Sequence, residues 1–243
     1  MTSKSIELGR KLSTTQVVHK KLSELYLEFL FCGGLPEAVK VWCEYKSFFD
    51  RETQVRKIHR DLLRMYKEDF GKYAESKDAL NILALWEQSA THLSRYRETV
   101  KRFKFKGIVS SKRGFKGLKD YFHYLKKAGL VTISYVVESP MYPLKSCSKE
   151  ALFKCFWHDT GLLLAQLDFS FKALISGTDI SYKGFISENW VANELEKSKP
   201  SSGLHSWMQN TAEIEFLLQT ASGNIIPIEV KNNNPRARSL DSF

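Results

Sequence analysis

Four residues near the end of the chain have types and spacing that could do metal-dependent chemistry. Glu229 and Lys231 are two residues apart in an expected strand, so both side chains point to the same face. Glu215 lies in the preceding expected strand, and Glu188 lies in an upstream expected helix. Carboxylates can hold Mg²⁺, which stabilises charge on a phosphate, while a lysine orients or deprotonates the attacking water. We therefore predict catalytic roles for Glu188, Glu215, Glu229 and Lys231, with the three glutamates as metal ligands.

The order of these residues resembles that of the PD-(D/E)xK nucleases, in which a strand acid precedes Glu-x-Lys on the next strand. The resemblance implies an aspartate at the position where this chain has Glu215. The extra methylene of glutamate moves the carboxylate by about 1 Å, which argues against retained activity. The alternative explanation of Glu229 and Lys231 is an ion pair on an exposed strand face.

A second candidate lies in the strongly basic segment 95–127. This segment holds twelve Lys or Arg residues against two acids, with phenylalanines interleaved. A helical apolar stripe ends near Gly129, and the β-rich run Val131–Val137 follows, which is the layout of a winged helix. The alternatives are a solvated basic face and a protein-interaction module. The predicted nucleic-acid-binding residues are Lys104, Lys106, Lys112, Arg113, Lys116 and Lys119.

Composition and charge restrict the class of protein. The 243 residues are 43% hydrophobic and carry a net charge of +10, which favours DNA or another acidic partner. The four cysteines lack zinc-site spacing, so we expect free thiols in a reducing cytoplasm. No signal peptide or long apolar run is present, so no membrane association is expected. No G-x-x-x-x-G-K-[ST] motif exists, so we expect no ATP site in this chain.

The elements that must position these residues follow from apolar periodicity. Helical patterns dominate the first 95 residues, and a polar loop is expected near 176–183. The fold class expected is α+β, a helical and winged-helix-like N-terminal part followed by a partial restriction-endonuclease-like α/β domain. The predicted division is a helical lead over 1–50, a helical or winged-helix-like domain over 51–144 and a partial nuclease-like domain over 145–243. The predicted helices cover 19–31, 37–45, 51–70, 78–93 and 185–196, and the predicted final strands cover 204–208, 214–219 and 225–230.

Short motifs spread over residues 19–240 resemble a domain of unknown function that follows the ATPase module in prokaryotic AAA-type ATPases. They include Gly33-Gly34-Leu35-Pro36-Glu37, Phe153-Lys154, Asp159-Thr160-Gly161-Leu162-Leu163, Gly184-Phe185-Ile186-Ser187-Glu188-Asn189-Trp190, Glu213-Ile214-Glu215-Phe216 and Pro227-Ile228-Glu229-Val230-Lys231. The resemblance implies an ATPase half upstream, a helical and winged-helix middle and a nuclease-like end. Relative to that pattern the chain lacks the ATPase half and a final helix and strand, so we expect a truncated product or a fragment.

These observations lead to three hypotheses about function. The first is a non-ATP-binding C-terminal portion of an AAA-type ATPase family protein that acts as a nucleic-acid or protein interaction module. The second is a Mg²⁺-dependent nuclease of the PD-(D/E)xK type. The third is a remnant that partners a separately encoded ATPase.

Overall fold

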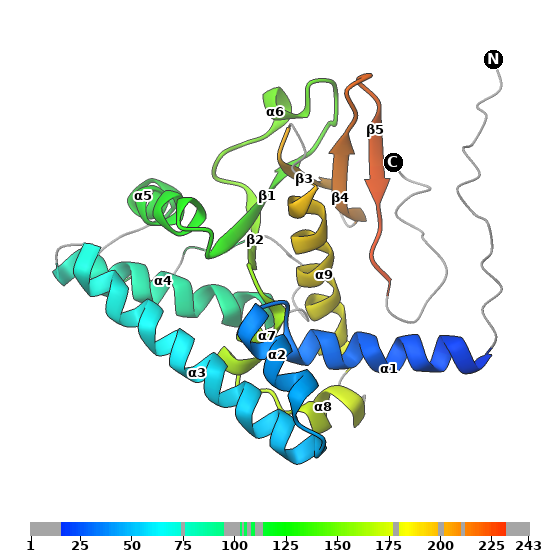
Figure 1. Ribbon diagram of the computed structural model, residues 1–243. Coiled ribbons are helices and arrows are strands. Elements are labelled where there is room, and N and C mark those ends of the chain that lie inside the picture. Colours follow the sequence, from blue (N-terminus) through cyan, green and yellow to red (C-terminus); the bar gives the residue numbers. More distant parts are fainter. Residues whose placement is uncertain are drawn as a thin grey trace.

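The fold combines helices with one mixed β-sheet (Figure 1). The computed structural model describes residues 16–73, 76–94, 103, 105, 108–109, 114–176, 180–198, 202–209 and 212–231. The helices are α1 (Gln16–Cys32), α2 (Pro36–Glu44), α3 (Phe48–Tyr73), α4 (Ser76–Ser94), α5 (Gly114–Lys127), α6 (Leu144–Cys147), α7 (Thr160–Gln166), α8 (Phe171–Ser176) and α9 (Ile180–Lys197). The strands are β1 (Val131–Val137), β2 (Phe153–Trp157), β3 (Leu204–Gln209), β4 (Ala212–Gln219) and β5 (Ile225–Ile228).

The sheet has the strand order β2-β1-β3-β4-β5. β1 pairs antiparallel with β2 and parallel with β3, and the remaining neighbours are antiparallel. The β3–β4 pairing contains a register shift, because His205 lies opposite Leu217 whereas Trp207 lies opposite Ile214. Two steps along β3 thus match three along β4, which is a β-bulge, a feature that often re-aims side chains near functional sites.

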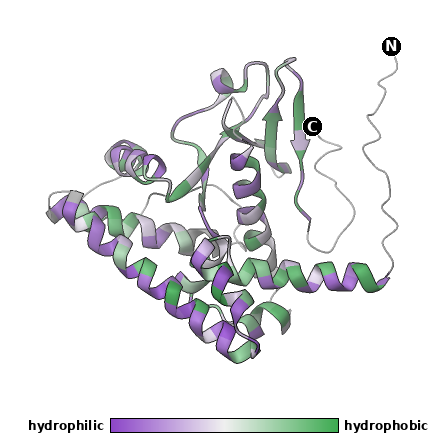
Figure 2. Ribbon diagram, viewed as in Figure 1, coloured by the Kyte–Doolittle hydropathy of each residue, from purple (hydrophilic) through white to green (hydrophobic). Residues whose placement is uncertain are grey.

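Helices α1 to α4 and α8 lie below the sheet in Figure 1, and α3 packs against α2, α4 and α7. Hydrophilic and hydrophobic residues alternate along α3 and α4 in Figure 2, as expected for helices with one buried side. α5 shows the same principle in its sequence, with its apolar residues three or four apart on the buried face: Leu118, Tyr121, Phe122 and Leu125. Among the described residues, no helix is long and apolar enough to cross a membrane.

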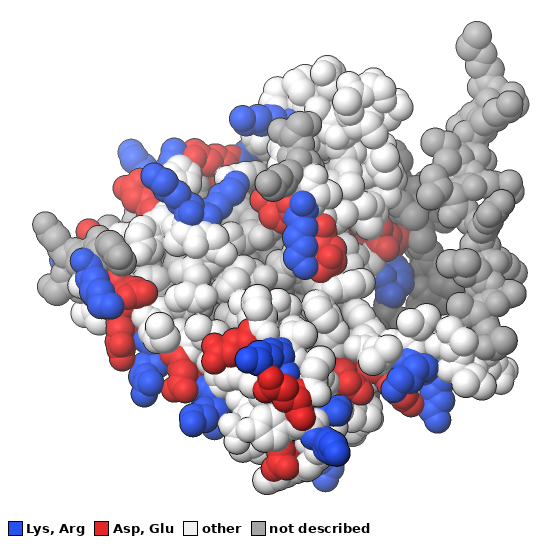
Figure 3. Space-filling model, in the orientation of Figure 1, with Lys and Arg blue, Asp and Glu red and all other residues white. Residues whose placement is uncertain are grey.

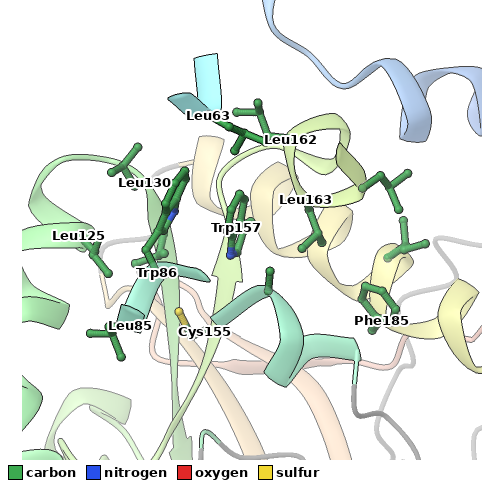
Figure 4. Packing of buried hydrophobic residues seen from close by; sticks show 14 of the residues in the cluster. Leu63, Leu85, Trp86, Leu125, Leu130, Cys155, Trp157, Leu162, Leu163 and Phe185 are labelled. Atoms are coloured by element: carbon green, nitrogen blue, oxygen red, sulfur yellow. The ribbon is translucent and has the colours of Figure 1, made fainter. Parts of the chain in front are cut away.

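The main hydrophobic core joins the helices to one face of the sheet. Trp86 of α4 stacks on Trp157 of β2, with ring centroids 4.6 Å apart (Figure 4). Trp157 Nε1 also donates a hydrogen bond to Ser89 Oγ over 2.8 Å. This core extends from Leu30 to Ile186, and the sheet itself crosses the predicted boundary after residue 144. The division into domains stays a prediction.

α9 covers the opposite face of the sheet. Phe156, Leu204 and Phe216 from three strands pack there with Ala192 of α9. The side chain of Asn189 forms two hydrogen bonds with the backbone of Trp157, accepting from its N–H over 2.7 Å and donating to its carbonyl over 2.9 Å. These two bonds fix α9 across β2, and therefore fix the neighbouring Glu188 as well.

Most of the expected helices and strands are present, with two corrections. The polar loop expected near 176–183 is wrong in its last part, because α9 already begins at Ile180. The last strand ends at Ile228, two residues earlier than expected, so Glu229 and Lys231 follow the strand instead of lying in it. The four cysteines are free, as expected.

Candidate functional site

A buried lysine is the centre of a charged cluster beneath α9. Lys154 lies in β2, all of whose residues are buried, and only 4% of its side chain is exposed. Its Nζ lies 3.5 Å from Glu188 Oε2 and forms an ion pair with Glu213 Oε1. A full positive charge is therefore held between an acid from α9 and an acid from β4, away from solvent.

Two glutamates of β4 face α9 just before the bulge. Ile214 and Leu217 pack together on one side of the sheet, whereas Phe216 packs on the other side against Phe156. The strict two-residue alternation of a strand is thus broken between positions 214 and 217. Glu213 and Glu215, which lie two apart before the irregularity, both act on the Lys154 ammonium group.

The cluster continues toward the surface beyond β5. The backbone N–H of Val230 donates a hydrogen bond to Glu215 Oε2 over 3.1 Å, which ties the end of β5 to β4. Lys231 Nζ lies 2.6 Å from Glu229 Oε1. The Glu229 side chain is only 2% exposed, whereas that of Lys231 is 40% exposed. Lys231 therefore lies where the charged cluster meets solvent.

The pKa values of both lysines are governed by these glutamates. Burial alone would lower the pKa of Lys154, but the negative charges of Glu188, Glu213 and Glu215 outweigh it and raise the pKa above its usual value. Burial also opposes the charge of Lys231, whose pKa is raised by its hydrogen bond to Glu229 and by the charges of Glu215, Glu229 and Glu188. Both ammonium groups therefore stay protonated at neutral pH. We call the six residues the glutamate–lysine cluster: Lys154, Glu188, Glu213, Glu215, Glu229 and Lys231.

The four residues predicted to act together therefore interact electrostatically. Glu188, Glu215 and Glu229 all act on Lys231. In the part of the chain that the structure describes, however, no three His, Cys, Asp or Glu side chains are arranged to hold a metal ion. The Lys154 ammonium contacts two of the glutamates instead. The observed arrangement therefore does not fit Mg²⁺, and the metal and catalytic roles stay predictions.

Two members of this cluster carried no predicted role. Phe153-Lys154 served only as part of the family resemblance, and Glu213 only as the neighbour of Glu215. The signal for Lys154 was a lone lysine inside the apolar run Phe153–Trp157. A lysine in such a strand is rarely buried unless it is paired, so an internal acid partner could have been expected.

The predicted nucleic-acid-binding residues are only partly within the described structure. Lys104, Lys106, Lys112 and Arg113 lie outside the described residues. Lys116 is exposed on α5, and Lys119 forms an ion pair with Glu150 at 2.8 Å. On the face shown in Figure 3, basic and acidic side chains are interspersed over much of the surface.

The glycine-rich motif of the sequence meets the Asp-Thr-Gly motif at a second buried polar region. Gly34 N–H donates to Asp159 Oδ2 over 2.7 Å, and Leu162 N–H donates to Asp159 Oδ1 over 2.9 Å, which caps α7. Gly33 has a φ of 76°, and a Cβ there would lie 2.3 Å from Asp159 Oδ1. Glycine is therefore required where the chain passes over this carboxylate.

Two side chains of α3 complete this region. Arg56 donates to the Gly161 carbonyl over 3.1 Å and lies 3.9 Å from the centre of the Phe31 ring. His59 Nε2 bonds the Cys32 carbonyl over 3.0 Å. Burial and the charge of Arg56 lower the pKa of His59 to about 4, so it is neutral at pH 7. We call this region the helix junction, and it consists of Gly33, Gly34, Arg56, His59, Asp159 and Gly161.

Comparison with known proteins finds two protein families, each of which matches one stretch of the chain. Residues 23–173 match the family described as domain of unknown function DUF8612, and residues 183–243 match domain of unknown function DUF4143. The second of these is commonly found with AAA ATPases, in accord with the resemblance noted from the motifs. No curated protein and no solved structure matches the chain significantly. Because the first match extends over more than half of its length, the chain belongs to the DUF8612 family.

Proposed function

We propose that the chain is the non-ATP-binding C-terminal portion of an AAA-type ATPase family protein and acts as an interaction module for DNA or another polyanion. In this proposal α5 is the binding helix, and the sheet with α9 is a restriction-endonuclease-like scaffold without nuclease activity. The observation that carries the proposal is the concentration of lysines on the solvent side of α5.

The lysines of α5 follow from its amphipathic sequence. The apolar face is buried against the core, so Lys116, Lys126 and Lys127 are exposed. Lys119 is already paired with Glu150, and α5 contains a single acidic residue, Asp120. The basic helix is followed by β1, the short helix α6 and β2, which pairs antiparallel with β1. This order is similar to that of a winged helix, which supports nucleic acid as the partner.

The glutamate–lysine cluster supports the scaffold part of the proposal. A nuclease of the PD-(D/E)xK type needs free carboxylates around a divalent metal. In this chain the Lys154 ammonium already pairs with Glu188 and Glu213. The same cluster fixes α9 to β2 and β4, which is a structural role.

A gel-shift titration over a range of salt concentrations tests DNA binding. With three or four phosphate contacts, log K should fall with log salt with a slope of about −3. This binding should be abolished in the triple variant Lys116→Glu/Lys126→Glu/Lys127→Glu. The control Lys46→Glu/Lys57→Glu/Lys172→Glu makes the same change of charge at exposed sites outside α5 and should bind much more tightly than the α5 variant. Absence of binding by the native chain at low salt would remove nucleic acid from the proposal.

The alternative function is a Mg²⁺-dependent nuclease, favoured by one observation. Three glutamates act together on Lys231, which is the lysine exposed at the edge of the cluster. If this function holds, the chain cleaves DNA with Mg²⁺ and Lys231→Ala abolishes the cleavage. Cleavage that survives Lys231→Ala would refute this assignment of the site.

A further inference from the structure

We infer that the exposed face of α1 pairs with the same face of α1 in a second copy of the chain, with the two helices antiparallel. The face consists of Val18, Leu22, Leu25 and Phe29, which we call the α1 stripe. The inference concerns association of the chain with itself and goes beyond the proposed binding of DNA.

The exposure of apolar side chains is the first step of the argument. Residues 16–25 are all exposed, and this half of α1 extends beyond α8 and α9 in Figure 1. Val18, Leu22 and Leu25 nevertheless carry large apolar side chains, which are 46%, 54% and 46% exposed. A short helix in water is only marginally stable, and most helical stability in proteins comes from packing of an apolar face. A partner that covers the stripe would therefore stabilise this half of α1.

The position of the stripe on the helix is the second step. Leu27, Leu30 and Phe31 attach α1 to the main hydrophobic core. With about 3.6 residues per turn, these three side chains lie on the side of α1 opposite the α1 stripe. α1 is thus apolar on two opposite sides, and the side that carries the stripe is available to another molecule.

The spacing of the stripe is the third step, and it fits a second helix of the same sequence. Its members are alternately four and three residues apart, which is the spacing of the buried positions in a coiled coil. In an antiparallel pair about a twofold axis, Leu22 lies opposite Leu25 of the second copy, and Val18 lies opposite Phe29 of the second copy. Every member of the stripe thus meets another member, and twofold symmetry closes the contact at two chains.

The charge beside the stripe is the fourth step, and it selects the antiparallel direction. Lys21 and Glu28 are two helical turns apart, so they flank the stripe on the same side. In the antiparallel pair each of them lies close to the other residue of the second copy, whereas a parallel pair lacks this attraction. Lys21 is available because its ion pair with Glu24, at 3.7 Å, is largely exposed and contributes little. Trp42 Nε1 donates to Glu28 Oε2 over 3.0 Å, which orients this carboxylate.

Sedimentation equilibrium of the full chain, without nucleic acid, tests the association. We expect a reversible dimer with a Kd on the order of 10⁻⁵ M, because the contact is small. Leu22→Asp should raise this Kd at least about tenfold, because it places a charge at the centre of an apolar contact. Leu80→Asp is the matched control, since Leu80 is an exposed leucine of α4, and it should leave the Kd unchanged.

Substitution of the flanking charges tests the direction of the helices. Lys21→Glu and Glu28→Lys should each raise the Kd about threefold to tenfold, because each places like charges together on both sides of the twofold axis. The double variant Lys21→Glu/Glu28→Lys should restore the native Kd. Weakening by both single variants without recovery in the double variant would contradict the antiparallel arrangement.

Disulfide cross-linking tests the register and does not depend on the charged variants. Chains with Leu22→Cys and chains with Leu25→Cys are mixed and oxidised, and both also carry Cys43→Ser because Cys43 is an exposed native thiol. Cross-links between the two different chains should predominate, because a disulfide needs Cα atoms within about 7 Å and only the antiparallel pair places these positions opposite each other.

Three results would overturn the inference. They are a native chain that stays monomeric at every concentration, a Leu22→Asp chain that dimerises as tightly as the native chain, and cross-links that form mainly between two copies of the same variant. A monomeric native chain would leave the α1 stripe to a different partner, such as a separately encoded ATPase.

Discussion

The helix junction and the glutamate–lysine cluster are both buried and polar, but they satisfy their polar groups in different ways. At the helix junction the partners are mostly backbone atoms, as when Arg56 donates to the Gly161 carbonyl and Asp159 accepts from Gly34. In the cluster the partners are mostly side chains of opposite charge, as for Lys154 with Glu188. Backbone partners fix one geometry, whereas the cluster depends on the charge of each side chain.

This difference separates a region held by backbone geometry from a region held by charge. The helix junction contains a histidine kept neutral by burial and a carboxylate used as a helix cap. Its groups are committed to holding α1, α3 and α7 together. The cluster keeps an excess of carboxylates over ammonium groups and reaches solvent at Lys231. The comparison predicts that loss of one charge in the cluster costs more stability than loss of one contact at the helix junction.

The largest effect is expected from removal of the Lys154 charge. Lys154→Met leaves buried carboxylates without their cation, and the loss of one partner from a buried pair costs about 3–5 kcal/mol. Urea unfolding should show this decrease in the free energy of unfolding. Lys197→Met is the matched control, because Lys197 pairs with Glu194 at 2.6 Å but is 63% exposed. The control should lose about 1 kcal/mol or less. Equal losses in both variants would show that burial of the cluster does not control its energy.

A pH effect of similar size is expected from His59 at the helix junction. Its pKa is about 4 in the folded chain against 6.5 for a free histidine, so the unfolded chain binds the proton first as the pH falls. Stability is therefore complete above about pH 6.5 and decreases by about 3 kcal/mol as the pH falls to about 4. Burial is the main cause of the lowered pKa, and the Arg56 guanidinium, 3.4 Å from Nδ1, adds to it because a proton on Nδ1 would face this positive charge.

The contribution of His59 is isolated by comparison with His59→Gln. Other groups titrate in the same range, but their effects are common to both chains and cancel in the difference. The native chain should lose more stability than His59→Gln between about pH 6.5 and about pH 4. Parallel pH profiles of the two chains would contradict the assignment of a neutral, buried His59.

A smaller loss is expected from an added methyl group at the helix junction. A Cβ at position 161 would lie 2.5 Å from the Cys32 carbonyl oxygen and 2.7 Å from His59 Cε1. Gly161→Ala should therefore lower the free energy of unfolding by about 2–3 kcal/mol through overpacking. Gly71→Ala is the control, because a Cβ there meets nothing within 4 Å. It should stabilise α3 by about 1 kcal/mol. If Gly161→Ala left the free energy of unfolding unchanged, α1 and α7 could move apart without loss of stability.

The same contrast explains what could be predicted from the sequence. The mixed α+β class and most elements follow from local periodicity, which depends on near neighbours in the chain. The grouping of Glu215 with Glu229 and Lys231 follows from the resemblance to the PD-(D/E)xK nucleases. The entry of Lys154 into that group depends on β2 lying across α9, a contact between residues far apart in sequence. The bulge in β4 could not be predicted either, because acidic and hydrophobic residues alternate in Glu213-Ile214-Glu215-Phe216 as in a regular strand. A winged helix and a restriction-endonuclease-like sheet remain proposals.

The smallest change in stability is expected on α5, which lies outside both buried regions. Lys116 is in the first turn of α5 and Lys127 is its last residue, so they lie at opposite ends of the helix dipole. Lys116→Glu should raise the free energy of unfolding by about 0.5 kcal/mol, and Lys127→Glu should lower it by about the same amount. Both substitutions change the net charge equally, so both should weaken DNA binding and make its salt dependence less steep. A loss of DNA affinity that follows stability instead of charge would show that α5 is only a structural helix. Equal losses of affinity with opposite changes in stability would identify it as the binding element.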